Sequence, residues 1–137
     1  MTFSLPQGLA IANLSIPPTE KEKDMENQRL KDHVQEIAND IQNGVVWEEG
    51  EEREGEMMDG MDYLSDALDI NYTVSSDLKV MIGARILVAF GGPNIWVDTS
   101  KGVVEGYWGS DSATAHFHED PMGVEMAASD LYWAARS

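Results

Sequence analysis

Apolar residues recur at helical spacing in the first third of the chain. They are Leu30, Val34, Ile37 and Ile41. Their steps of four, three and four residues place them on one face of an α-helix. Thr19, followed three residues later by Glu22, has the form of a capping box, and Asn43-Gly44 is a typical helix end. The pattern predicts a helix over residues 19–43 with this face buried.

The same period returns from Glu56 to Asp69, where it forms two stripes. The apolar stripe consists of Met57, Met61, Leu64 and Leu68. The acidic stripe, on another face, consists of Asp59, Asp62, Asp66 and Asp69. Gly60 lowers the helix propensity of this stretch without preventing a helix. We therefore expect a second helix over residues 56–69 that holds its aspartates in a row.

Strand patterns replace the helical ones after residue 70. Residues 79–90 are almost continuously apolar, which predicts a strand in the middle of the sheet with both faces covered, and Gly83 marks a candidate bulge. Shorter β-rich runs between Gly, Pro and Asn turn signals predict further strands. These runs are Asn71–Val74, Ile95–Asp98, Val103–Trp108 and Ala113–His118.

A final helix is predicted after Asp120-Pro121, which has the form of an N-cap followed by a first-turn proline. Its apolar positions are Val124, Ala128, Leu131 and Ala135. The order of elements is that of an α+β fold. We expect N-terminal helices, an antiparallel meander of four or five strands, and the C-terminal helix packed on the sheet.

The chain of 137 residues has the length of one common domain. We expect a single domain made of an extended segment (1–18), a helical acidic region (19–69) and a sheet with the C-terminal helix (70–137). Cysteine is absent, which excludes disulfides and thiolate metal sites. Residues 1–16 fit neither a signal peptide nor a membrane span, because no Lys or Arg precedes their apolar run and Pro6 and Gly8 interrupt it. These features favour a soluble cytoplasmic protein.

Negative charge is concentrated in residues 48–69. Ten of these 22 residues are Asp or Glu, opposed only by Arg53, in a chain whose formal net charge is −16. The acidic residues are Glu48, Glu49, Glu51, Glu52, Glu54, Glu56, Asp59, Asp62, Asp66 and Asp69. Such a field attracts surfaces of opposite sign and repels nucleic acid, so we expect a basic partner surface. Mutual repulsion and two glycines predict a loop over residues 48–55.

Helical steps of three or four residues would space the aspartates by roughly 4.5–6 Å along the axis. Phosphates of a nucleic-acid strand are spaced comparably, so such a row can occupy the Lys and Arg sites that a nucleic-acid-binding protein keeps for the backbone. An acidic face that only maintains solubility is the alternative interpretation. The sequence leaves both open.

A metal-dependent enzyme is a further alternative. Residues 48–59 contain the EExxE and ExxD patterns of all-α nucleotide pyrophosphohydrolases, but the motifs are nearly contiguous and interrupted by glycines, so we interpret the match as chance. His116 and His118 alternate on a predicted strand, which could place two rings on one face for a transition metal. Exposed polar residues are the simpler interpretation. The sequence has neither a nucleophile elbow nor a phosphate-binding turn, so we expect no enzyme and no cofactor.

Trp96 is the aromatic residue that we expect at a partner surface. It alternates with Ile95 and Val97, so it faces outward if those two face the core. A second layer covering Trp96 is the alternative. Exposed aromatics also leave open a structural or assembly protein that forms homo-oligomers, such as a homodimer, or that docks on a phage or host component.

The segment FGGPNIWVDTSKGVVEGYWGSD, residues 90–111, resembles a segment of short acidic hypothetical proteins of phages and prophages. The resemblance extends from Asp66 to the C-terminus, excludes the N-terminal third and carries no catalytic residues over. Small acidic phage proteins without cysteine are often inhibitors of host defence, such as anti-CRISPR and anti-restriction proteins. The resemblance therefore implies a non-enzymatic inhibitor in the host bacterial cytoplasm. Its expected partner is a basic nucleic-acid-binding protein such as a CRISPR effector or restriction complex.

Overall fold

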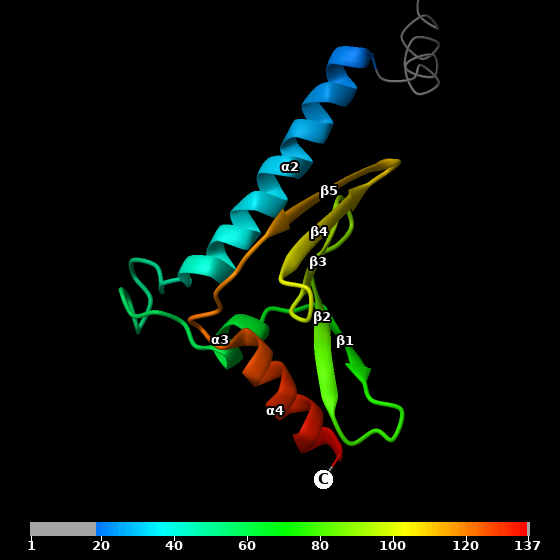
Figure 1. The fold of residues 1–137 in the computed structure, drawn as a ribbon. Coiled ribbons are helices and arrows are strands. Elements are labelled where there is room, and N and C mark those ends of the chain that lie inside the picture. The colour runs from blue at the N-terminus through cyan, green and yellow to red at the C-terminus, as the bar shows by residue number, and fades with distance from the viewer. Residues whose placement is uncertain (1–18, 137) are drawn as a thin grey trace, which may run out of the picture.

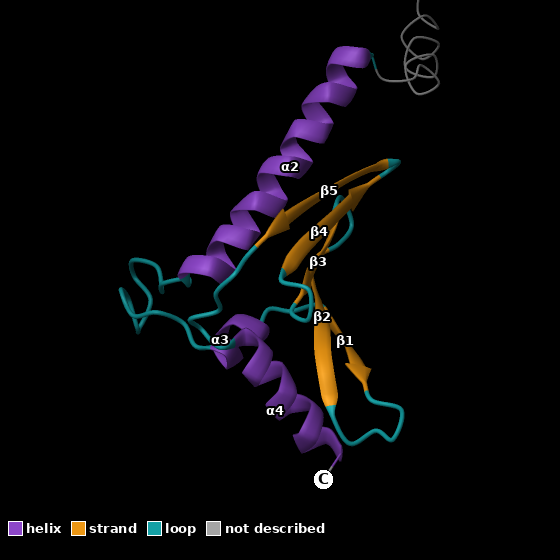
Figure 2. Cartoon of the chain, viewed as in Figure 1, coloured by secondary structure: helices purple, strands orange, loops and turns teal. Residues whose placement is uncertain are grey.

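The structure, a computed structural model that describes residues 19–136, places two long helices on one face of a five-stranded sheet (Figures 1 and 2). In chain order the elements are α2 (Glu20–Asn43), α3 (Gly60–Leu64), β1 (Asp69–Val74), β2 (Met81–Ala89), β3 (Asn94–Asp98), β4 (Val103–Trp108), β5 (Asp111–His116) and α4 (Val124–Arg136). Each strand pairs antiparallel with the next one along the chain, so the sheet is a meander. The predicted α+β fold is confirmed. The predicted extended segment 1–18 lies outside the described residues.

The first predicted helix is α2, and it begins and ends where its caps are. The Thr19 hydroxyl accepts a hydrogen bond from the Glu22 N–H at 3.1 Å, and the Gly44 N–H donates to the Asp40 carbonyl. The predicted apolar face is buried against β4 and β5. Gly106 of β4 permits this close approach, because a Cβ there would lie 2.6 Å from Val34 Cγ1.

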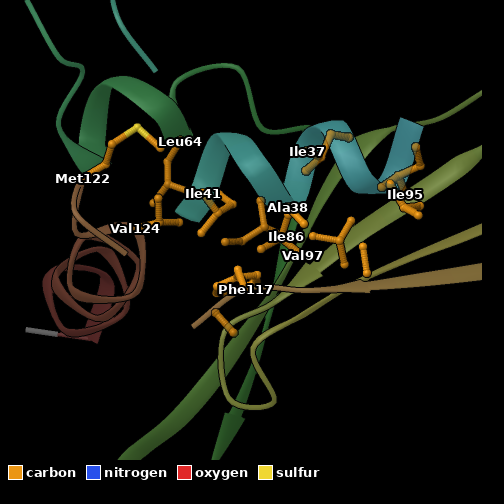
Figure 3. Close-up of a cluster of buried hydrophobic side chains, with 14 of the residues drawn as sticks. Ile37, Ala38, Ile41, Leu64, Ile86, Ile95, Val97, Phe117, Met122 and Val124 are labelled. Carbon is orange, nitrogen blue, oxygen red and sulfur yellow. The ribbon is translucent and has the colours of Figure 1, made fainter. Parts of the chain in front are cut away.

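The core lies between the sheet and the helices (Figure 3). Its most deeply buried side chains are Leu30, Val34 and Ile41 of α2, Ile86 of β2, Ile95 and Val97 of β3, Val104 of β4 and Val124 of α4. The prediction that residues 79–90 form the middle strand is wrong. The strand order β1-β2-β3-β4-β5 places β3 in the middle of the sheet and β2 between β1 and β3. Only one face of β2 is covered by a described helix. The β1–β2 register shifts beside Gly83, where Ile82 is the additional residue.

The predicted helix over residues 56–69 is wrong in extent, because α3 has only five residues. After Leu64 the chain turns, and the Leu68 N–H donates to the Leu87 carbonyl at 2.9 Å before Asp69 begins β1. Strand pairing with β2 satisfies these backbone groups and partly buries Ile70 in the core, which outweighs the helical period of the sequence. Of the four apolar residues in the predicted stripe only Leu64 is buried.

Helix α4 begins at Val124, three residues later than Asp120-Pro121 predicted. The Asp120 carboxylate still caps it, accepting hydrogen bonds from the N–H groups of Gly123, Val124 and Glu125 at 3.1, 2.9 and 3.0 Å. The first turns bury Val124, Ala127 and Ala128, whereas Leu131 and Ala135 are exposed, contrary to the prediction.

The reason for the exposed end of α4 is that its last turns contact the sheet through a different residue. The ring of Tyr132 lies 5.0 Å from that of Tyr72 on β1.

Among the helices within residues 19–136, none has the length and apolar character that crossing a membrane requires.

Candidate functional site: the acidic loop

The most acidic stretch of the chain is held in a hairpin between α2 and α3. The Trp47 N–H donates to the Glu56 carbonyl at 2.9 Å, the Gly55 N–H to the Trp47 carbonyl at 3.1 Å, and the Met58 N–H to the Val45 carbonyl at 2.8 Å. We refer to residues 45–58 as the acidic loop. It projects away from the sheet and from α4 (Figure 1). The loop predicted over residues 48–55 is therefore confirmed.

Two glutamates hold the tip of the acidic loop from inside. The Glu51 carboxylate accepts from the Glu48 N–H and the Glu54 carboxylate accepts from the Gly50 N–H, each at 2.7 Å. Gly50 has a φ of 92°, which side chains of L-residues rarely adopt. Because hydrogen bonds to a carboxylate are among the strong ones, these two bonds stabilise the turn at the tip.

Arg53 connects the acidic loop to α3. Its Nε lies 3.1 Å from Glu56 Oε2 and its Nη1 3.0 Å from Asp62 Oδ2, and its Cζ lies 5.6 Å from the centre of the Trp47 ring. The hydrogen bond to Glu56 and the charge of Asp62 raise the pKa of Arg53. The Asp59 N–H and the neighbouring Arg53 lower the pKa of Asp62. The one cation of this region is thus engaged by two of its carboxylates.

The predicted row of four aspartates does not form. Asp59 is the N-cap of α3 and accepts from the Asp62 N–H at 2.8 Å, while the Asp62 carboxylate accepts from the Asp59 N–H at 3.0 Å. Asp66 follows the helix in a turn. Asp69 begins β1 and alternates with Ile70, so it points to the face of the sheet opposite the core. Because α3 is short, the four aspartates lie on different elements and do not form the row that a longer helix would have produced.

The carboxylates best placed for a partner are in the acidic loop. Glu48, Glu49 and Glu52 are exposed, and their carboxylates make no hydrogen bond or ion pair within residues 19–136. Sequence reasoning included these three among ten equivalent acids and could not separate them from those with structural roles. The two groups of glutamates differ because backbone N–H groups donate hydrogen bonds to Glu51 and Glu54, and these contacts form only in the folded loop.

Trp96 lies on the face of the sheet opposite the core, as its alternation with fully buried Ile95 and Val97 predicts. The Cζ of Arg85 lies 4.6 Å from the centre of its ring, and an Arg85 nitrogen lies 3.4 Å from Glu105 Oε1. Within the described chain no helix covers this face. Trp96 is only partly exposed and already has a cationic neighbour, and it does not lie with the acidic loop.

The two histidines considered for a metal-dependent enzyme lie in different elements, one in β5 and one after it. His116 ends β5, and His118 follows the strand, where its backbone N–H donates to Gln42 Oε1 at 2.6 Å. Nowhere in residues 19–136 do three His, Asp or Glu side chains come together in an arrangement that could hold a metal ion.

Comparisons of the chain with protein-family models, with curated proteins and with solved structures found no match.

Proposed function

We propose that this protein is a non-enzymatic inhibitor of the phage type, which uses the acidic loop to occupy the cationic groove of a bacterial nucleic-acid-targeting defence complex in the host cytoplasm. The observation that carries the proposal is the acidic loop itself: six glutamates between residues 48 and 56 lie on a hairpin whose two sides are connected by backbone hydrogen bonds. A basic groove built for phosphates is the surface such a shape complements.

Pre-organisation distinguishes this loop from an acidic tail that serves solubility alone. A partner that binds an ordered loop avoids most of the entropy cost of ordering it. Glu51, Glu54 and Glu56 maintain the loop, which leaves Glu48, Glu49 and Glu52 free to pair with lysines and arginines of the partner. The resemblance of residues 90–111 to phage and prophage proteins supports a CRISPR effector or restriction complex as that partner.

Capture from a bacterial lysate tests the proposal. Immobilised wild-type protein is expected to retain a nucleic-acid-binding complex at about 0.1 M NaCl and release it at about 1 M NaCl, as the Debye length falls from about 10 Å to about 3 Å. The double variant Glu49→Lys, Glu52→Lys should lose this complex. A matched control, Glu119→Lys, Asp130→Lys, makes the same change in formal charge at exposed acids of the loop before α4 and of α4 itself, and should retain it.

The proposal is contradicted if the loop variant retains the same complex as the control. It is also contradicted if the captured proteins remain bound at the higher salt concentration, because an interface dominated by exposed charges is screened there.

A further inference from the structure

A hollow opens at the base of the acidic loop, where α2, α3 and the end of β2 meet. Its volume is about 260 Å³. Its apolar floor consists of Ile37, Val45, Met58, Ala67 and Val88. Val88 follows buried Ile86 by two residues on β2 and therefore lies on the same face of the sheet. Sites for small molecules usually measure about 300–1,000 Å³, so this hollow fits one side chain better than a cofactor.

The polar groups of the hollow are two carboxylates, Asp40 and Asp66, and the phenol of Tyr63. Asp40 is half-buried, and its carboxylate makes no hydrogen bond or ion pair within residues 19–136. Burial, with a smaller effect of Glu36, raises the pKa of Asp40. Burial and the charge of Asp40 raise the pKa of Tyr63 to about 12. Asp66 lines the same hollow as a second carboxylate without a partner in the described chain.

The hollow has a neighbour on the side of the acidic loop. A second hollow shares Val45, Met58 and Asp66 with the first and is also lined by Glu48, Glu51 and Asp62. No lysine, arginine or histidine of the described chain lines either one. The two hollows therefore lie next to each other at the base of the acidic loop, and carboxylates line both of them.

We propose that the hollow receives one lysine or arginine side chain of the partner protein, whose methylene stem lies on the apolar floor and whose cationic head pairs with Asp40 and Asp66. The identity of the partner rests on the proposed function, whereas the chemistry of the hollow does not. A basic side chain fits because its two parts match the two parts of the hollow. A cation at Asp40 also offsets the cost of keeping a carboxylate partly removed from water.

The test uses the whole protein with ¹³C-labelled methyl groups and three small probes. N-acetyl-lysine N-methylamide and N-acetyl-arginine N-methylamide carry the cation, and N-acetyl-norleucine N-methylamide carries the stem alone. At least one cationic probe is expected to shift the methyl resonances of Val45, Ala67 and Val88 saturably, and to bind about tenfold more tightly than the norleucine probe, the size of one charged hydrogen bond.

Matched variants test whether the cationic group of the probe pairs with Asp40 and Asp66. The double variant Asp40→Asn, Asp66→Asn should bind the cationic probe about tenfold more weakly. Asp24→Asn, at an exposed carboxylate near the other end of α2, should bind as wild type does. Equal binding of the norleucine probe, unchanged binding by the double variant, or no saturable shift of these methyl groups would each overturn the proposal.

The outcome is independent of the lysate capture. Probe binding combined with a failed capture would keep the hollow as a basic-side-chain site and remove the inhibitor proposal. Capture without probe binding would do the reverse.

Discussion

Replacing Ile86 by alanine is expected to lower the free energy of unfolding by about 3–4 kcal/mol, because large-to-small changes at buried isoleucines combine lost burial with a cavity. Ile86 is 0% exposed and lies in the core between the sheet and α2 (Figure 3). It pairs with Ile70 of β1 and Val97 of β3, so neighbours on both sides hold the cavity open. Urea unfolding followed by circular dichroism measures the loss.

The control for this prediction lies on the same strand. Ile82 loses the same atoms on substitution by alanine but is 53% exposed, so Ile82→Ala should cost less than about 1 kcal/mol. Equal losses for the two variants would show that the assigned core face of β2 is wrong.

Replacing Gly60 by alanine is expected to destabilise the protein by about 2–3 kcal/mol through overpacking. A Cβ at this position would overlap the carbonyl oxygen of Gly123 and lie 2.8 Å from the Cβ of Ala127. Backbone atoms at the start of α4 cannot move aside as a flexible side chain would. Helix propensity alone predicts the opposite sign, a gain of about 1 kcal/mol. The sign of the change in unfolding free energy therefore decides whether α3 packs on α4 as described.

Gly92 provides the comparison for Gly60. A Cβ added at Gly92 would have no neighbour within 4 Å, and the residue has no positive φ, so Gly92→Ala should be neutral or slightly stabilising. A stabilised Gly60→Ala variant would contradict the close contact between α3 and α4.

The two periodic stretches show what the sequence could and could not predict. For α2, the caps, the apolar stripe and the burial all agree, so local and tertiary preferences select the same structure. In residues 56–69 they conflict. The stripes favour a helix, but pairing of Leu68 and the residues of β1 with β2 ends it. A local period does not show that these residues pair with a strand that follows later in the chain.

The sequence predicted which residues make the candidate site acidic, but it did not predict the contacts that those residues make in the folded loop. Charge density indicated a loop at residues 48–55, and this is where the hairpin lies. The pattern gave no sign that Glu51 and Glu54 bind backbone N–H groups or that Arg53 lies over Trp47. The hollow at Asp40 was missed because α2, the acidic loop, α3 and β2 each contribute to it.

The homodimer and the role of Trp96 stay predictions. The guanidinium of Arg85 lies over one face of the Trp96 ring, so that ring already has an intramolecular partner. In the acidic loop, by contrast, the carboxylates of Glu48, Glu49 and Glu52 have no hydrogen bond or ion pair within residues 19–136 that binding to a partner would break.

The most direct test of the central claim, that the ordered acidic loop competes with a polyanion for a cationic groove, is displacement of fluorescent DNA from the purified captured complex, measured by anisotropy. Wild-type protein and the Glu119→Lys, Asp130→Lys control are expected to release the DNA at similar concentrations, while Glu49→Lys, Glu52→Lys should need a far higher concentration. Equal displacement by all three proteins, or binding of wild-type protein to the complex with the DNA still in place, would contradict the account.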